Sequence, residues 1–395
     1  MRMRILHTSD WHIGRTFHGS PTMDALAEVL GALTARVREL AAEGTPVDVV
    51  VVAGDVFDSA TPSGAAYTLL SEVLRGLHEA GTRVIVTSGN HDSAARLGFQ
   101  AQLLRDGIDV LTDPLAIGTP VTVSDEHGPV HFFGIPYLEP SVVRQYWPAA
   151  DGAVALRTQA QTMSHAMDLV RRGMSERAGR SVAIAHCFAA GVDATVGLER
   201  EVRQGGLDVV PLDVFDGPDY VALGHIHGRN RVSERVRYAG APLHYSFGEQ
   251  DKPRGAWLVE LDAAGLASVE WLDLPVPRRL VTLTGTLDEI LSAENVAAHA
   301  DDWVCAVYTD ALPQTEPMRR LRERYPFCAM VQHQPATGGE RARLTYSDRL
   351  RTAVTDVERV EAFLEHVREG HGASEQEREL IREIIDDRVR AEALV

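Results

Sequence analysis

The sequence predicts an α/β fold, with a layered domain over residues 1–275 in which helices flank a central β-structure. Short runs rich in β-branched residues recur along this part of the chain, and some are apolar throughout, such as the four consecutive valines at positions 49–52. A strand with two apolar faces lies in a sheet that is covered on both sides. Between the runs, apolar residues recur at helical spacing. This alternation of strands and helices is typical of layered α/β domains.

The predicted elements follow one another in order. Strands are expected at residues 4–10, 48–55, 83–92, 130–137, 181–187 and 220–227. Helices are expected at 24–43, at 61–80 with Thr61 as N-cap and Pro62 after it, and near 155–178. Later strands without long helices between them, which give the domain a β-rich end, are expected at residues 235–247, 255–262 and 267–274.

Two smaller parts follow the first domain. Residues 276–346 begin at a proline pair and combine predicted strands with a short helix, so they are expected to form a small α+β domain. Residues 347–395 carry apolar stripes at helical spacing, and Ser374 with Glu377 matches a capping box. The sequence therefore predicts a helical hairpin as the C-terminal segment.

Composition restricts the classes of function. Charged residues make up 24% of the chain and hydrophobic residues 45%, as in ordinary globular proteins. The net charge of −17 argues against a diffuse electrostatic grip on nucleic acid, although a local site can still bind a phosphate. Three cysteines without metal-site spacing suit a reducing compartment. No run approaches the roughly 20 apolar residues of a membrane helix, so we expect a cytoplasmic protein without a membrane partner.

Residues that can bind metal ions stand at the ends of five predicted strands. They are two carboxylates, one amide and four imidazoles: Asp10, His12, Asp55, Asn90, His186, His225 and His227. Ligand sites of open α/β sheets gather at the carboxyl ends of strands. Seven oxygen and nitrogen donors exceed the needs of one tetrahedral zinc and suit two ions of Mn, Fe or Zn. Such a pair, about 3.5–4 Å apart, can stabilise both the attacking and the leaving oxygen of a phosphoryl displacement.

In this order, Asp-x-His, Gly-Asp, Gly-Asn-His-Asp, a lone His and Gly-His-x-His resemble the motifs of the calcineurin-like metallophosphoesterase superfamily. A closer resemblance is to the SbcD family, the nuclease subunits of bacterial SbcCD complexes. It rests on the blocks LHTSDWHIGR, VVAGDVFDSATP, TSGNHDS and YAGAPLHYSFGE. The resemblance implies a layered metallophosphoesterase β-sandwich flanked by helices. It also implies that residues 276–346 are a capping, DNA-recognition domain and that residues 347–395 bind a partner.

The resemblance assigns roles to individual residues. The implied ligand sets are Asp10, His12 and His227 for one ion, and Asn90, His186 and His225 for the other. Asp55 would bridge the two ions. His91 would face the substrate and stabilise or protonate the leaving oxygen. Asp58 stands where archaeal and eukaryotic nucleases of this family usually carry a second histidine, and we hypothesise that it orients the catalytic His91 by a hydrogen bond.

The implied activity is metal-dependent hydrolysis of DNA phosphodiester bonds by an exo- and endonuclease. The attacking group would be a metal-activated water, and the cofactors would be two divalent ions, Mn²⁺ above all. Duplex DNA ends and hairpins are the expected substrates. The expected partner is an SbcC-type, SMC-like ATPase, with a homodimer of the nuclease chain inside a heterotetramer. Such a complex would serve DNA repair, recombination and replication at the nucleoid. All of these expectations come from the resemblance.

Other interpretations of the same residues stay open at this point. A metallophosphoesterase for small substrates, such as a cyclic-nucleotide phosphodiesterase or a phosphomonoesterase, would share the metal motifs. A scaffold of this fold without metals is a non-enzyme alternative. The basic cluster at residues 319–324 is either a solvated helix face or a contact with DNA phosphates. The C-terminal hairpin either docks on its own chain or binds another protein.

Overall fold

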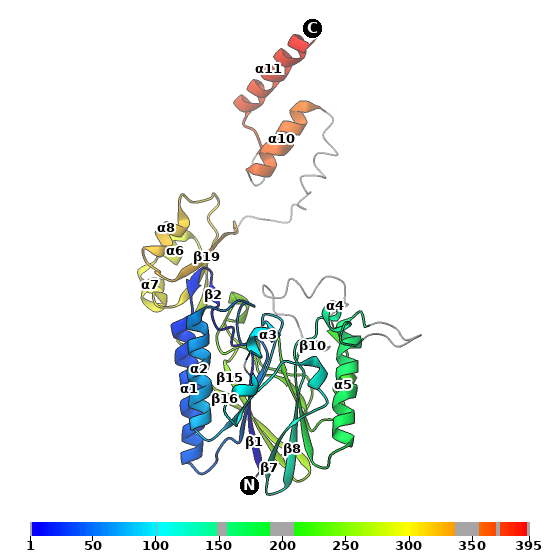
Figure 1. Ribbon diagram of the computed structural model, residues 1–395. Coiled ribbons are helices and arrows are strands. Elements are labelled where there is room, and N and C mark those ends of the chain that lie inside the picture. The colour runs from blue at the N-terminus through cyan, green and yellow to red at the C-terminus, as the bar shows by residue number, and fades with distance from the viewer. Residues whose placement is uncertain are drawn as a thin grey trace. The chain divides into compact units, whose positions relative to one another are not determined.

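The computed structural model describes residues 2–99, 101–147, 156–189, 209–335, 355–368 and 372–392 (Figure 1). The chain divides into two compact units. The larger contains residues 1–309 and 314–333, and the smaller contains residues 310–313 and 334–395.

The first sheet of the larger unit has six strands. Their order across the sheet is β16 (Gly265–Asp273), β15 (Gly255–Asp262), β1 (Met3–Thr8), β4 (Val49–Ala53), β5 (Arg83–Thr87) and β6 (Ile108–Leu111). Strands β1, β4, β5 and β6 run parallel, with Ile5 paired to Val49 and Val49 to Arg83. The hairpin of β15 and β16 adds to the free edge of β1 in the antiparallel direction.

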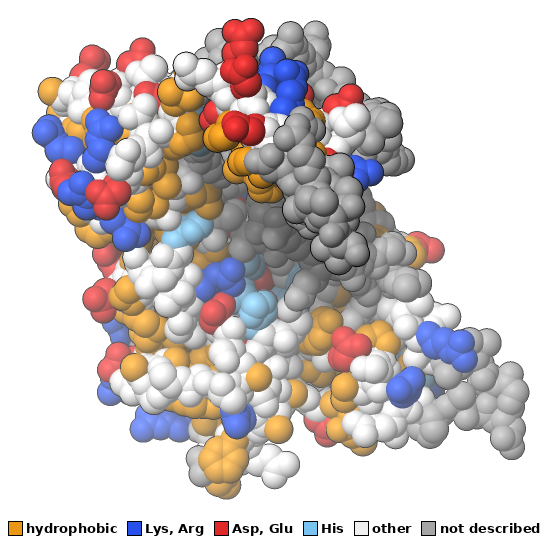
Figure 2. Space-filling model, turned by 90° about the horizontal axis from the view of Figure 1, so that it is seen from above, with side chains coloured by type: hydrophobic (Ala, Val, Ile, Leu, Met, Phe, Trp, Pro, Cys, Tyr) orange, Lys and Arg blue, Asp and Glu red, His pale blue; other side chains and the backbone are white. Residues whose placement is uncertain are grey.

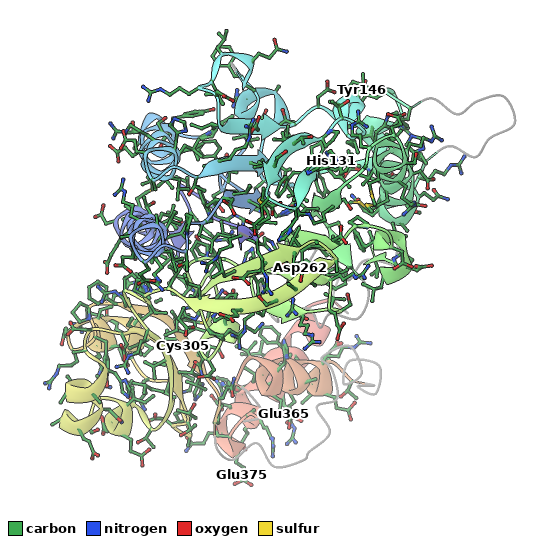
Figure 3. All side chains as sticks on the ribbon, turned by 90° about the horizontal axis from the view of Figure 1, so that it is seen from below. His131, Tyr146, Asp262, Cys305, Glu365 and Glu375 are labelled. Atoms are coloured by element: carbon green, nitrogen blue, oxygen red, sulfur yellow. The ribbon has the colours of Figure 1, made fainter. Side chains whose placement is uncertain are left out.

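The second sheet also has six strands. Their order is β13 (Asn230–Arg231), β14 (Val236–Tyr238), β12 (Tyr220–Gly224), β9 (Arg180–His186), β8 (Gly128–Gly134) and β7 (Val121–Asp125). Strands β8, β9, β12 and β14 are parallel. The two sheets pack face to face, because Ile5, Val49 and Val51 of the first share one buried core with Phe132 and Ile184 of the second (Figure 3). The predicted β-sandwich is confirmed.

Helices cover the outer faces of the sandwich (Figure 1). Helices α1 (Met23–Ala42) and α2 (Gly64–Glu79) lie on the first sheet, and α5 (Gln159–Ser175) lies on the second. Val50 and Val52 face the helices, while Val49 and Val51 face the other sheet. The run of valines is therefore apolar throughout because both of its faces are buried.

Two sequence expectations need correction in detail. Helix α2 has Ser63 as its N-cap, whose Oγ accepts a hydrogen bond from the Ala66 N–H at 3.3 Å, and it does not start at Thr61. The strand expected at 235–247 ends at Tyr238. The next residues form a turn, in which Gly240 has a φ of 80° that interrupts the extended conformation.

Short elements connect the main ones. They are β2 (Thr16–Phe17), β3 (Ser20–Pro21), α3 (Ala94–Leu97), η1 (Ala101–Leu103), η2 (Pro114–Ala116), α4 (Pro140–Val143), β10 (Phe188–Ala189), β11 (Val209–Val210), η3 (Leu212–Phe215) and η4 (Phe247–Glu249).

A small three-stranded sheet completes the larger unit. Its parallel strands are β17 (Leu280–Gly285), β18 (Trp303–Tyr308) and β19 (Cys328–His333), with α6 (Leu287–Ile290), α7 (Ala293–His299) and α8 (Pro317–Arg322). It has its own core around Leu287, Val304 and Leu321. The Phe17 ring packs 5.1 Å from Trp303, so this module contacts the first domain near β2. The end of the expected domain, residues 336–346, lies outside the described residues, and the domain limits stay a prediction.

The smaller unit contains helices α10 (Asp356–Val367) and α11 (Glu375–Glu392). The predicted capping box is present: Ser374 N–H donates to Glu377 Oε2 at 2.8 Å, and Glu377 N–H donates to Ser374 Oγ at 3.3 Å. An ion pair of 2.8 Å between Arg378 and Glu361 links the two helices. Residues 347–354 of the expected hairpin lie outside the described residues. None of the helices in the described ranges combines the length and apolar character needed to cross a bilayer.

The packing of α1 predicts a stability effect. Leu33 is fully buried against the first sheet, so Leu33→Ala should lower the free energy of unfolding by about 2–5 kcal/mol through lost burial and a cavity. Glu28→Ala, on the exposed face of the same helix, should change it by about 0.5 kcal/mol or less. Urea denaturation followed by circular dichroism measures both, and an unchanged midpoint for Leu33→Ala would refute this packing.

Candidate metal centre

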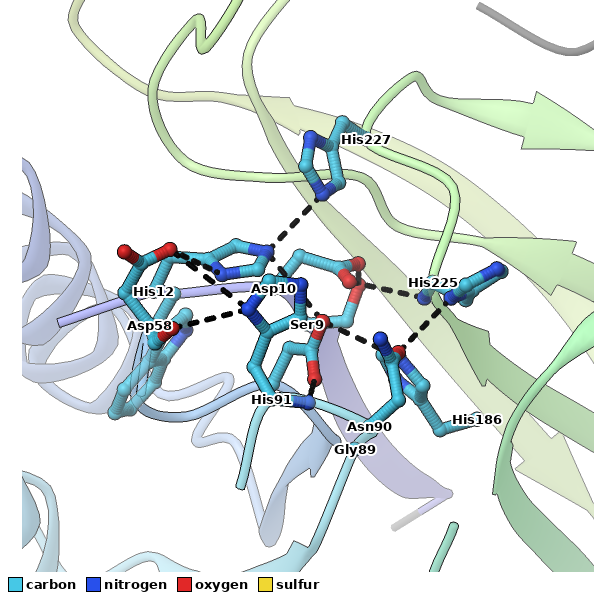
Figure 4. A network of polar contacts seen from close by, with 12 residues as sticks. Ser9, Asp10, His12, Asp58, Gly89, Asn90, His91, His186, His225 and His227 are labelled. Atoms are coloured by element: carbon cyan, nitrogen blue, oxygen red, sulfur yellow. Dashed lines mark hydrogen bonds and ion pairs between the residues drawn. The ribbon is translucent and has the colours of Figure 1, made fainter. Parts of the chain in front are cut away.

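The structure brings all seven predicted ligand residues together. Figure 4 labels all of them except Asp55. Asp10 and His12 follow β1, Asp55 follows β4, and Asn90 follows β5. The other three come from the second sheet, where His186 ends β9, and His225 and His227 follow β12. The site therefore lies at the carboxyl ends of parallel strands, as the sequence predicts.

The carboxylate of Asp55 lies between two groups of donors. Its Oδ2 is 3.5 Å from His12 Nε2 and 3.4 Å from His186 Nε2. Its Oδ1 accepts a hydrogen bond from the main-chain N–H of His91 at 2.9 Å. One oxygen is thus held by the backbone, while the other faces imidazoles on both sides. This is the arrangement that a bridging ligand requires.

The first group consists of Asp10, His12 and His227, whose donor atoms all lie within 4.8 Å of one another. His12 Nε2 and His227 Nε2 face each other at 3.0 Å. Burial, with the neighbouring His12, holds the pKa of His227 well below its usual value, so this imidazole is neutral. The two facing nitrogens can share one proton in a hydrogen bond, or both can direct their lone pairs at a metal cation.

The second group consists of Asn90, His186 and His225. Asn90 Oδ1 lies 3.0 Å from His186 Nε2 and 3.1 Å from His225 Nδ1. The other ring nitrogen of His186, Nδ1, lies 3.0 Å from the Ala53 carbonyl, to which it can only donate. The Nε2 atom of a neutral His186 would therefore direct its lone pair at the oxygens of Asn90 and Asp55. A proton or a metal cation must occupy this position.

The pKa values of the buried groups reflect that requirement. Burial disfavours the charged form of His186, but the Asp55 carboxylate, together with Asp10 and the Ala53 carbonyl, outweighs burial and raises the pKa of His186 to about 9. Burial likewise opposes the charge of Asp55, yet His186 and His12 hold the pKa of this carboxyl well below its usual range. Burial lowers the pKa of His225 to about 3. The ionised Asp55 and the neutral His225 are in the forms that bind metal, and a cation can replace the proton on His186.

The backbone is strained at these residues. Among the described non-glycine residues with positive φ are Asp10 at 54°, His12 at 46°, Asp55 at 48° and His225 at 103°. Such conformations cost about 1–3 kcal/mol each and persist where the surrounding structure enforces them. Main-chain hydrogen bonds do so here, since Asp10 N–H donates to the Gly54 carbonyl at 3.1 Å and His12 N–H to the Asp55 carbonyl at 2.9 Å.

Two positions in the sequence motifs have no room for a side chain. A side chain at Gly89 would collide with the carboxylate and the main-chain nitrogen of Asp55, and one at Gly224 would collide with the Ala53 carbonyl. These positions are glycine because the ligand-bearing loops approach one another closely.

Further residues hold the candidate ligand loops together. The Asp92 carboxylate accepts hydrogen bonds from the main-chain N–H groups of Gly89, Val56 and Phe57 at 2.8–3.0 Å, and so joins two ligand loops. Its place at the end of the Gly-Asn-His-Asp motif was the available signal. The buried ion pair between Glu249 and Arg254, at 2.7 Å, left no such signal, because only the fold brings it near the ligands.

Arg254 acts on a ligand loop through the main chain. Its guanidinium donates to the carbonyl of His227 and, at 3.1 Å, to the carbonyl of Ala241. This buried cation therefore holds the backbone of a candidate ligand in place without contacting its ring.

His91 and Asp58 lie beside the first group. His91 Nδ1 lies 3.0 Å from the main-chain carbonyl of Asp58 and 4.0 Å from its carboxylate, so the hydrogen bond between these residues comes from the main chain of Asp58. The His91 side chain is 38% exposed, and histidine side chains are visible in a hollow of the surface in Figure 2. His91 can therefore reach a ligand that enters from solvent.

The close approach at Gly89 predicts a loss of metal. Gly89→Ala should displace the Asp55 carboxylate and lower the number of Mn²⁺ ions that the chain retains. Gly64→Ala, at a position with open space around it, is the matched control and should retain the wild-type number. Elemental analysis after equilibration with Mn²⁺ and gel filtration measures this number. Full occupancy in Gly89→Ala would show that the proposed collision is relieved without cost.

Comparison with known proteins identifies the family. A family model described as calcineurin-like phosphoesterase matches residues 3–229, and the SbcD_C model, described as type 5 capsule protein repressor C-terminal domain, matches residues 276–380. Among solved structures, the chain is similar to the crystal structure of TT1561 of Thermus thermophilus, with 14% identity over 69% of this chain and 99% of that chain. The TM-score of 0.38 is too low to support an inference from that structure. The first family model covers more than half of the chain, which therefore belongs to the calcineurin-like phosphoesterase family of metal-dependent phosphoester hydrolases and carries the C-terminal domain of SbcD-type proteins.

Proposed function

We propose that this protein is a two-metal-dependent DNA nuclease, the nuclease subunit of an SbcC–SbcD-type complex. The observation that carries the proposal is the position of Asp55 Oδ2 between two groups of donors, 3.5 Å from His12 and 3.4 Å from His186. One group would hold the first ion through Asp10, His12 and His227, and the other would hold the second through Asn90, His186 and His225. Oxygen and nitrogen donors without thiolate suit Mn²⁺.

Two divalent ions bound here would supply charge neutralisation at the phosphate and activation of a water molecule. The protein side chains orient the reaction. Hydrogen bonds hold Asp10 on both oxygens, from the main-chain N–H of His225 at 2.9 Å and from Ser9 Oγ at 2.5 Å. With Nδ1 of His91 donating to the Asp58 carbonyl, Nε2 is the ring atom that exchanges a proton with the substrate. His91 is thus suited to protonate the leaving oxygen.

DNA is the proposed substrate class because the phosphoesterase domain is joined to further modules. The SbcD_C match spans residues 276–380, which include the three-stranded module and most of the described C-terminal helices. A phosphoesterase for small substrates would share the metal motifs, so these further modules are what favours DNA. Duplex ends and hairpins remain the proposed substrates within this class.

A cleavage assay separates the two enzyme candidates. With Mn²⁺, the wild-type chain should cut an end-labelled hairpin duplex, and Asp55→Asn should reduce cutting to background, since both groups of donors lose the shared charge. Hydrolysis of p-nitrophenyl phosphate derivatives without any cutting of DNA would favour the small-substrate phosphoesterase. Undiminished cutting by Asp55→Asn would place the active site elsewhere.

The basic cluster of α8 is partly neutralised. Arg319 pairs with Glu316 at 2.7 Å and with Glu323 at 3.5 Å, and Arg320 pairs with Asp288 at 3.2 Å. A contact of this cluster with DNA phosphates would have to replace these exposed ion pairs, which are individually weak. That contact stays a prediction. The net charge of −17 suggests that a partner supplies much of the duplex-binding surface.

The C-terminal helices supply a surface for that partner. Exposed apolar side chains lie on both: Val360, Phe363 and Val367 on α10, and Leu380 and Ile384 on α11. Amphipathic helices with such exposed residues bind in grooves of other proteins. An SbcC-type ATPase is the proposed partner, in a heterotetramer that contains a homodimer of this chain. Its proposed place is the nucleoid, in DNA repair and recombination.

Charge substitutions on these helices test the partner. Ile384→Asp and, separately, Val367→Asp should abolish co-purification with the SbcC-type ATPase, because a buried carboxylate without a partner is costly. Mn²⁺-dependent phosphodiesterase activity should be unchanged. Gln376→Asp adds the same charge at an exposed polar position and should keep the partner bound. Retention of the ATPase by both apolar-site variants would exclude this surface.

A further inference from the structure

We propose that Asp58 and Arg15 form a positioning pair for His12, a candidate ligand in the group of Asp10, His12 and His227. Asp58 would then act through His12 and not through the catalytic His91. This inference rests on the metal centre of the proposed function, but its test does not depend on the cleavage of DNA.

The two nitrogens of the His12 ring face different neighbours. Nε2 faces the centre, 3.0 Å from His227 Nε2 and 3.5 Å from Asp55 Oδ2. Nδ1 lies 3.3 Å from Asp58 Oδ1, an ion-pair contact that is not aligned as a hydrogen bond, and it has no other hydrogen-bond partner among the described residues. A carboxylate at Nδ1 keeps the proton there and leaves the lone pair of Nε2 for a metal ion, and it also fixes the orientation of the ring.

Arg15 holds the carboxylate in this position. Its Nη1 donates to the same oxygen, Asp58 Oδ1, at 3.0 Å. The guanidinium lies 4.7 Å from the centre of the Tyr245 ring, and the Tyr245 hydroxyl donates to the Trp11 carbonyl at 2.8 Å. Tyr245 also packs edge to face against His12, 5.4 Å between ring centres. Arg15 and Tyr245 thus enclose the Asp58 and His12 pair.

The geometry disfavours two other roles for Asp58. Its carboxylate is 4.0 Å from His91 Nδ1, compared with 3.3 Å from His12 Nδ1, and the His91 nitrogen already has the Asp58 carbonyl at 3.0 Å. Donor atoms of His12, Asp58 and His91 also lie close enough together for a further cation. However, the guanidinium of Arg15 already binds the Asp58 oxygen and supplies the positive charge there.

His227 has no carboxylate as close to its ring. Its Nδ1 lies 3.9 Å from Glu249 Oε1, compared with 3.3 Å between His12 Nδ1 and Asp58 Oδ1, and neither nitrogen has an aligned hydrogen-bond partner among the described residues. The Glu249 carboxylate is instead engaged by Arg254 at 2.7 Å and by Ser246 at 3.0 Å. Of the two histidines in this group, His12 is therefore the one whose ring a neighbouring carboxylate can orient.

Calorimetric titration of the metal-free, full-length protein with Mn²⁺ tests the pair. Asp58→Ala should weaken one of the two binding sites by about 10–100-fold and leave the other unchanged. Asp58→Asn, which keeps an acceptor oxygen without the charge, should give a smaller loss, as should Arg15→Gln. His91→Ala should bind both ions with wild-type affinity. Arg96→Gln is the matched control, because its guanidinium binds the Ala60 carbonyl at 2.8 Å and does not contact Asp58.

Three results would overturn the proposal. Wild-type affinity at both sites in Asp58→Ala would show that His12 needs no carboxylate. Equal weakening of both sites, or a lower melting temperature of the metal-free variant, would assign Asp58 a general structural role. Weakening of the same site by His91→Ala would show that the three residues act as one unit. Because every readout is metal binding or melting, a failure of DNA cleavage in the wild type leaves the test valid.

Discussion

The candidate site is built around one buried carboxylate, that of Asp55, whose negative charge requires a compensating positive charge. Asp55 is 2% exposed, is ionised, and lies between imidazoles on both sides. A buried charge is tolerated only when it is paired or bound to metal. In the protein alone, a proton on His186 meets part of this demand. In the proposed metal centre, two cations would meet it fully.

Each group of donors draws on both sheets. Asp10 and His12 come from the first sheet and His227 from the second, and Asn90 from the first is joined by His186 and His225 from the second. The spacing between donors is therefore set by the apolar core between the sheets, in which Val51 and Ile184 are fully buried. That close packing also sustains the strained φ angles of the candidate ligand residues.

The sequence allowed predictions where metal-binding residue types stand at the ends of recognisable strand patterns. The positions of the candidate ligands could be predicted because polar residues follow apolar strands. The buried strand could be predicted because four consecutive valines leave no polar face. Contacts that depend on the fold could not be predicted. Residue spacing does not reveal that the main chain, and not the carboxylate, of Asp58 contacts His91, or that Glu249 and Arg254 meet beneath His227. The early end of β14 depends on the turn at Gly240.

The most direct test of the two-metal centre is the anomalous diffraction of crystals grown with Mn²⁺. If two ions bind here, two peaks should appear on opposite sides of the Asp55 carboxylate, about 3.5–4 Å apart. One should lie among Asp10, His12 and His227, and the other among Asn90, His186 and His225. A single peak, or a peak among His12, Asp58 and His91 in place of these, would contradict the two-metal centre.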